Sequence, residues 1–148
     1  QVGVIFRHHG TLDKFIGDAI MAFWGAPVAD PQHALHAVEA AMEMVDVLDA
    51  FRTERNLPGF DVGIGIHSGP AVVGMLGSEQ RMEYTAIGDT VNLASRLEGT
   101  TKGIARILVS QKTRDLCGDA ITFVAHGAHK VKGREEPVCV YEPRRKAT

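Results

Sequence analysis

Two residues near the start of the chain have side chains suited to binding a cation or a phosphate. Asp18 follows Gly17 between two apolar runs, so we expect it at the tip of a hairpin. One carboxylate there could bind Mg²⁺ and leave other coordination positions for phosphate and water; an ordinary turn Asp that bonds its own backbone is the alternative. Lys14, four residues earlier, could contact a ligand or be a solvated strand lysine.

Further polar side chains occur at spacings that could serve chemistry. Asn92 and Arg96 are four residues apart, so on a helix they share one face and could direct an amide and a guanidinium at a ribose and a phosphate. A solvated polar pair would look the same. Lys132 could bind phosphate or belong to a charged turn. His67 and Ser68 are neighbours on an expected strand and point to opposite faces, which disfavours a nucleophile and base pair.

The elements that position these residues follow from the spacing of apolar residues. Residues 11–24 read as two strands broken at Gly17, and apolar residues at three- and four-residue steps after Asp30 and Pro31 predict a helix that ends near 56–59. We expect further strands at 62–67, 71–76, 81–87, 107–110, 121–124 and 138–141, and helices at 89–98 and 111–116. The glycines that alternate with branched residues in 62–67 should leave one face of that strand open to close backbone approach. Strands and helices alternate without a repeat, which predicts one α/β or α+β domain over residues 1–148.

The composition of the chain disfavours several classes of protein. The 148 residues carry 16 Lys and Arg against 18 Asp and Glu, a formal charge of −2, which disfavours nucleic-acid binding. The most apolar uncharged run, 19–28, is too short to cross a bilayer. Cys117 and Cys139 lack the spacing of a zinc site or a disulfide framework. We expect a soluble domain without nucleic-acid partners or direct membrane contact.

Two longer segments resemble the catalytic domain of class III nucleotidyl cyclases: GTLDKFIGDAIMAFWGAP at 10–27 and EYTAIGDTVNLASRLE at 83–98. The match continues through GIHSGPAVVG at 65–74 to VKG at 131–133, in family order, and covers nearly the whole chain. The resemblance implies a ferredoxin-like α/β sandwich (α+β), with a central, mostly antiparallel sheet flanked by helices. It also implies a head-to-tail dimer with each active site at the interface, drawing on both subunits.

The implied reaction converts ATP to 3′,5′-cyclic AMP and pyrophosphate, by attack of the ribose 3′-hydroxyl on the α-phosphorus with the help of two Mg²⁺ or Mn²⁺ ions. Asp18 matches a metal-binding aspartate, and Lys14 and Thr85 match the base-selecting pair. Asn92 matches the residue that orients the ribose, and Arg96 the one that stabilises charge at the α-phosphate. Lys132 and Arg106 match groups that contact the other phosphates. The resemblance is to the Lys and Thr sub-type of adenylyl cyclase, whose members are often bicarbonate-responsive.

The base-selecting residues also make chemical sense. A lysine and a threonine hydroxyl can satisfy the N1 acceptor and the N6 donor of adenine, whereas guanine presents an N1 proton to the lysine. A guanylyl cyclase is therefore disfavoured. A nucleotide-binding or regulatory cyclase-like domain without turnover is the other alternative, and the joint presence of all the matched residues argues against it.

One departure from the family pattern concerns the metal site. The family's first metal aspartate lies upstream, in a Phe-x-Asp-Ile setting, and residues 1–9 contain no acidic residue. We expect the chain to begin inside or just after the helix that follows that strand. The fold would then lack its first strand, and the chain alone would be inactive and dimerise poorly. We expect the parent to be a cytoplasmic enzyme of intracellular signalling, or the cytoplasmic part of a larger, membrane-attached or multidomain protein.

Overall fold

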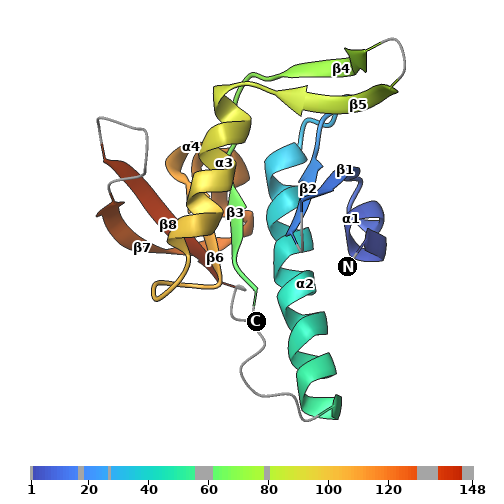
Figure 1. The fold of residues 1–148 in the computed structure, drawn as a ribbon. Coiled ribbons are helices and arrows are strands. Elements are labelled where there is room, and N and C mark those ends of the chain that lie inside the picture. Colours follow the sequence, from blue (N-terminus) through green and yellow to red (C-terminus); the bar gives the residue numbers. More distant parts are fainter. Residues whose placement is uncertain are drawn as a thin grey trace.

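A computed structural model describes residues 2–16, 19–26, 28–55, 62–78, 81–129 and 137–144 (Figure 1). The helices in these ranges are α1 (Val2–Arg7), α2 (His33–Arg55), α3 (Asp89–Thr100) and α4 (Gln111–Cys117), followed by a short 3₁₀ turn at Gly118–Ala120. The strands are β1 (Thr11–Ile16), β2 (Ala19–Phe23), β3 (Ile64–Ile66), β4 (Val72–Ser78), β5 (Arg81–Ile87), β6 (Ile107–Ser110), β7 (Thr122–His129) and β8 (Val138–Arg144).

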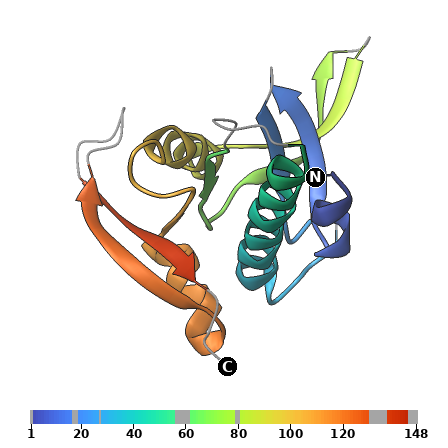
Figure 2. The same ribbon diagram turned by 90° about the horizontal axis from the view of Figure 1, so that it is seen from below.

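The strands of the described residues form one larger sheet and two hairpins. The larger sheet has the order β3-β6-β8-β7, in which β3 runs parallel to β6 and the other pairs are antiparallel. β1 pairs with β2, and β4 pairs with β5. The long helix α2 lies between the side of the molecule formed by α1, β1 and β2 and the side formed by the larger sheet (Figures 1 and 2). The β4–β5 hairpin projects from one end (Figure 1).

The strand β6 is the centre of the core, because its four residues are all buried. Its side chains alternate between two apolar clusters, as successive strand residues point to opposite faces. Ile107 and Val109 pack in a cluster with Val38 of α2, while Leu108 packs in a second cluster with Leu97 of α3. A strand that is buried on both faces reads as a continuous apolar run, which is what residues 107–109 show.

Glycines allow β3 to pass directly against α3. A Cβ atom at Gly65 would lie 2.3 Å from the backbone nitrogen of Glu98 and 2.5 Å from the carbonyl oxygen of Ala94. The alternation of branched residues with glycines in 62–67 predicted a strand with one face open to close backbone approach, and the structure confirms that prediction.

Most element predictions agree with the structure in type, and several differ in their bounds, including β4, which runs to Ser78, and β8, which runs to Arg144. α3 passes through Gly99 and ends at Thr100, since Gly99 needs no positive φ and Thr101 caps the last turn with a backbone hydrogen bond to Glu98. β3 is limited to the three residues that pair with β6. β7 extends beyond 124 because a bulge, with Gly127 at φ 80°, keeps its pairing with β8.

No helix in the described ranges is long and apolar enough to cross a membrane. α2 has the length, at 23 residues, but carries acidic residues along its course, among them Glu39, Glu43 and Asp46.

Candidate active site

The candidate site is built around a bulge in β1. Leu12 pairs with Ala22 and Lys14 pairs with Met21, so Asp13 is an extra residue with no partner on β2. A bulge of this kind bends the strand and changes where a side chain points. In a regular strand Asp13 and Lys14 would project to opposite faces; here the Lys14 ammonium lies 3.7 Å from Oδ1 of Asp13.

Asp13 also reaches β5. Its Oδ2 atom accepts a hydrogen bond of 2.7 Å from the hydroxyl of Thr85 and one of 3.2 Å from the backbone N–H of Ala86. The Asp13 side chain is 1% exposed, while that of Lys14 is 37% exposed. Thr85 is buried, with 5% of its surface exposed. A ligand would therefore meet Lys14 first and at most a small part of Thr85, with the carboxylate hidden behind both.

Local contacts hold the β1–β2 hairpin in place. The indole N–H of Trp24 donates to the carbonyl of His8 at 2.8 Å, and the Thr11 hydroxyl donates to the carbonyl of Ala26 at 2.7 Å. Arg7 and His8 both bond Glu43 of α2. The hydrogen bond from Arg7 outweighs desolvation and lowers the pKa of the Glu43 carboxyl, so this link between the helices is ionic at neutral pH.

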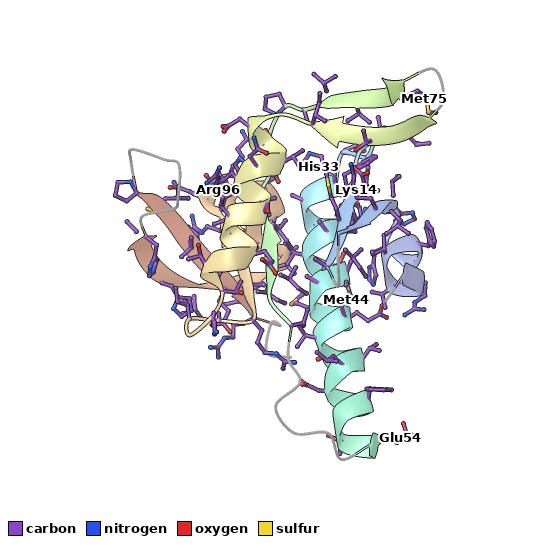
Figure 3. The ribbon with its side chains drawn as sticks, in the orientation of Figure 1. Lys14, His33, Met44, Glu54, Met75 and Arg96 are labelled. Carbon is purple, nitrogen blue, oxygen red and sulfur yellow. The ribbon has the colours of Figure 1, made fainter. Side chains whose placement is uncertain are left out.

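Asn92 and Arg96 occupy one side of α3, one turn apart. Asn92 is exposed and Arg96 is partly buried. The helix begins after Gly88, whose φ of 134° suits glycine, and the Asn92 N–H bonds the Gly88 carbonyl at 3.2 Å. Lys14 lies on the β1 side of α3, and Arg96 lies on the side that carries the larger sheet (Figure 3). The described residues of one chain thus do not bring Lys14 and Arg96 together.

Arg106 lies at the far end of α3 from Asn92, just before β6. Its guanidinium forms an ion pair of 2.9 Å with Asp49 of α2, and it lines a pocket of about 610 Å³ with Thr101 and Lys102. A helix of 12 residues is about 18 Å long, so the structure does not bring Arg106 to Thr85 at the other end. Its predicted contact with phosphate stays a prediction.

Two of the predicted site residues, Asp18 and Lys132, lie outside the described residues. Within the described ranges no group of three or more His, Cys, Asp or Glu side chains could hold a metal ion. The prediction of a metal at this hairpin therefore rests on Asp18 and on the family resemblance.

His67 and Ser68 bond other partners than each other. His67 Nδ1 lies 2.7 Å from the hydroxyl of Ser110, and the buried Ser68 hydroxyl lies 2.8 Å from that of Thr113. These bonds link the segment just after β3 to β6 and α4, which agrees with the view that the two residues are not a nucleophile and base pair.

Sequence reasoning did not single out Asp13. It lies inside the GTLDKFIGDAIMAFWGAP segment, but strand alternation places its side chain away from Lys14. Only the bulge in the β1–β2 register reveals that Asp13 contacts both Lys14 and Thr85.

The family model of the adenylate and guanylate cyclase catalytic domain matches residues 5–141 of this chain. The chain belongs to this cyclase family. The resemblance in the 10–27 and 83–98 segments is therefore confirmed, as is the α+β fold that it implied.

Individual cyclases are similar over almost the whole chain. Adenylate cyclase 1 of Rhizobium meliloti is 43% identical over 143 residues, which are 94% of this chain and 22% of that protein. The adenylyl cyclase CyaB from P. aeruginosa superposes with a TM-score of 0.88 at 33% identity, over 99% of this chain and 77% of that chain. The guanylyl cyclase Cya2 superposes with a TM-score of 0.85 at 34% identity, over 99% of this chain and 75% of that chain. The chain spans between 6% and 28% of the length of the first curated relatives that it matches.

Proposed function

We propose that this cyclase domain belongs to an adenylyl cyclase, which converts ATP to 3′,5′-cyclic AMP and pyrophosphate. The oxygen of the ribose 3′-hydroxyl attacks the α-phosphorus, its proton passes to solvent, and the bond from the α-phosphorus to the bridging oxygen breaks as pyrophosphate leaves. Relatives named adenylate cyclase at 40 and 43% identity support the family-level part of this proposal.

The observation that carries the choice of ATP is the pairing of Lys14 and Thr85 around Asp13. The Lys14 ammonium is a hydrogen-bond donor. The Thr85 hydroxyl donates its own hydrogen bond to Asp13, so its oxygen has only lone pairs left and can accept a hydrogen bond from a base. Adenine offers the complementary pattern, an acceptor at N1 and a donor at N6. Guanine offers a donor at N1 and an acceptor at O6, so it would place donor against donor at Lys14.

The remaining residues are assigned to the ribose and phosphates. Asn92 would orient the ribose, Arg96 would stabilise the charge that develops on the α-phosphoryl oxygens, and Lys132 would bind the terminal phosphates, with Arg106 as a further phosphate contact. Donors placed in advance for such charge typically contribute two or more powers of ten in rate each. Because Lys14 and Arg96 lie on different sides of α3, a second copy of the domain is expected to complete each site (Figure 3).

Divalent metal ions, Mg²⁺ or Mn²⁺, are the cofactors expected for this family. Their role would be to polarise the reacting phosphate and lower the pKa of the attacking hydroxyl. The described residues do not bring together a cluster of side chains that could hold these ions, and Asp18 is the metal ligand that we propose from this chain.

A guanylyl cyclase is the second candidate, because Cya2 superposes nearly as well as the adenylyl cyclase CyaB. The nucleotide preference decides between the two. The test is to assay the whole protein for cyclic AMP and cyclic GMP with ATP, GTP and Mg²⁺ or Mn²⁺. Cyclic AMP formation with a clear preference for ATP supports the proposal; equal or greater cyclic GMP formation refutes the choice of base, and no product from either nucleotide refutes the activity.

A double variant tests the two base-selecting residues. Lys14→Glu with Thr85→Cys should lose most ATP activity and shift the preference toward GTP, because Glu accepts from the guanine N1 and N2 protons. Lys112→Glu, which reverses the charge of an exposed lysine on α4, is the matched control and should keep the ATP preference. An unchanged preference in the double variant would remove both residues from base selection.

A further inference from the structure

Within the part of the chain that the structure describes, Asp13 contacts both proposed base-selecting residues. Its position follows from the bulge at Leu12/Lys14, which leaves it unpaired with β2 and turned toward β5. The Ala86 N–H, at 3.2 Å, holds the carboxylate to the β5 backbone independently of the Thr85 side chain. The group is therefore fixed by main-chain geometry and not only by the residues on which it acts.

We propose that Asp13 is a positioning residue that sets the hydrogen-bond direction of the base-reading pair and so selects adenine over guanine; this rests on the proposed function. A threonine hydroxyl can donate or accept, because its proton rotates about the C–O bond. A carboxylate accepts only, so the 2.7 Å bond from Thr85 to Asp13 requires the hydroxyl proton to point inward. Thr85 is thereby left with lone pairs alone to offer a base.

The same carboxylate orients Lys14. Its Oδ1 atom is buried, has no hydrogen-bond partner within the described structure, and lies 3.7 Å from the Lys14 ammonium. A buried carboxylate oxygen without a partner is costly, so it attracts the ammonium and limits the directions that this flexible side chain samples. Because the side chain of Asp13 is 1% exposed, it acts through Lys14 and Thr85 and not by touching the nucleotide.

Without Asp13, the directions of the hydrogen bonds that Lys14 and Thr85 offer to a base are no longer fixed. The Thr85 hydroxyl could turn its proton outward and donate to the O6 of guanine. Lys14 would lose its contact with the Asp13 carboxylate. The ratio of kcat/KM for ATP to that for GTP is the quantity that this change should lower, by about tenfold, the effect typical of one hydrogen bond to a charged group.

The experiment measures this ratio in the whole protein for the wild type, Asp13→Ala and Asp13→Asn. The ratio does not depend on how much of a sample is folded, so a loss of yield does not disturb it. Asp13→Ala should lower it about tenfold. Asp13→Asn should lower it less, since its amide oxygen can still accept from Thr85 and Ala86. Asp115→Ala removes an exposed carboxylate that pairs with Arg114, and should leave the ratio unchanged.

A second background shows whether Asp13 acts through Thr85. In Thr85→Val there is no hydroxyl to orient, so adding Asp13→Ala should change the ratio much less than it does in the wild type. Competition of ATP and GTP against a fluorescent ATP analogue gives the same comparison at the level of binding, should a variant bind without turnover. An unchanged ratio in Asp13→Ala, or an equal change in both backgrounds, overturns the inference while leaving an ATP-selective wild type intact. A wild type without preference for ATP overturns the proposed function, and this inference with it.

Discussion

Replacing Gly65 by alanine should destabilise the domain, because β3 and α3 touch through their backbones at this point. The added Cβ would lie 2.3 Å from the Glu98 nitrogen and 2.5 Å from the Ala94 oxygen. Both are main-chain atoms of a helix, so neither can rotate away as a side chain would. Relief requires β3 and α3 to separate by about an ångström, which also loosens the contact of Leu97 with Leu108 in the core.

The size of the effect follows from overpacking in well-packed cores, which costs about 1–3 kcal/mol, and contact with a rigid backbone places the cost of Gly65→Ala at about 3 kcal/mol. For a domain of this size each kcal/mol lowers Tm by about 2–4 °C, so we expect a fall of about 6–12 °C. Thermal and urea unfolding followed by circular dichroism would measure both quantities.

Gly99→Ala is the matched control, since it makes the same chemical change on α3 itself. A Cβ at Gly99 meets nothing within 4 Å, and the residue has no positive φ. Alanine should therefore stabilise the helix by about 0.5–1 kcal/mol. The close approach of β3 to α3 is wrong if the free energy of unfolding of Gly65→Ala lies within about 1 kcal/mol of the wild-type value. It is also wrong if the two variants change the stability in the same direction.

Three further perturbations test other parts of the molecule. Burial, with a smaller effect of Glu39, raises the pKa of the Cys117 thiol to about 11, so iodoacetamide at pH 8 should label exposed Cys139 and spare Cys117 until the protein is unfolded; equal labelling rates in the native protein would contradict this. Burial opposes ionisation of Asp30 before α2, but the bonds from His36 and the Gln32 N–H outweigh it and lower its pKa from 3.8. Asp30→Ala should therefore cost stability at neutral pH and cost progressively less as the pH falls through that lowered pKa, where the wild-type carboxyl takes up a proton. A difference in the free energy of unfolding between the wild type and Asp30→Ala that stays constant from pH 7 to pH 2 would argue against a stabilising role of the ionised Asp30 carboxylate. Asp18→Ala in the whole protein should reduce cyclic AMP formation by about a hundredfold or more if Asp18 binds a catalytic metal, and near-normal turnover would remove that role.

Local sequence chemistry determined much of the architecture. The apolar spacing after Asp30 predicts α2, the strand expected at 81–87 matches β5, and the glycines at 63 and 65 predict a strand face open to close approach. These features depend on residues close together in the chain, so periodicity and backbone preference are sufficient to predict them. The family followed from the motifs at 10–27 and 83–98.

The tertiary structure decided what lies beyond local rules. Asp13 and Thr85 are 72 positions apart, and their hydrogen bond exists because a bulge in β1 turns the carboxylate toward β5. The strand order β3-β6-β8-β7 and the ion pair between Arg106 and Asp49 likewise join distant segments. Strand alternation assigns a side chain to a face only while the pairing is regular, so a single extra residue is enough to reverse that assignment. For this reason the sequence identified the two residues proposed to read the base, and only the fold revealed the carboxylate that contacts both of them.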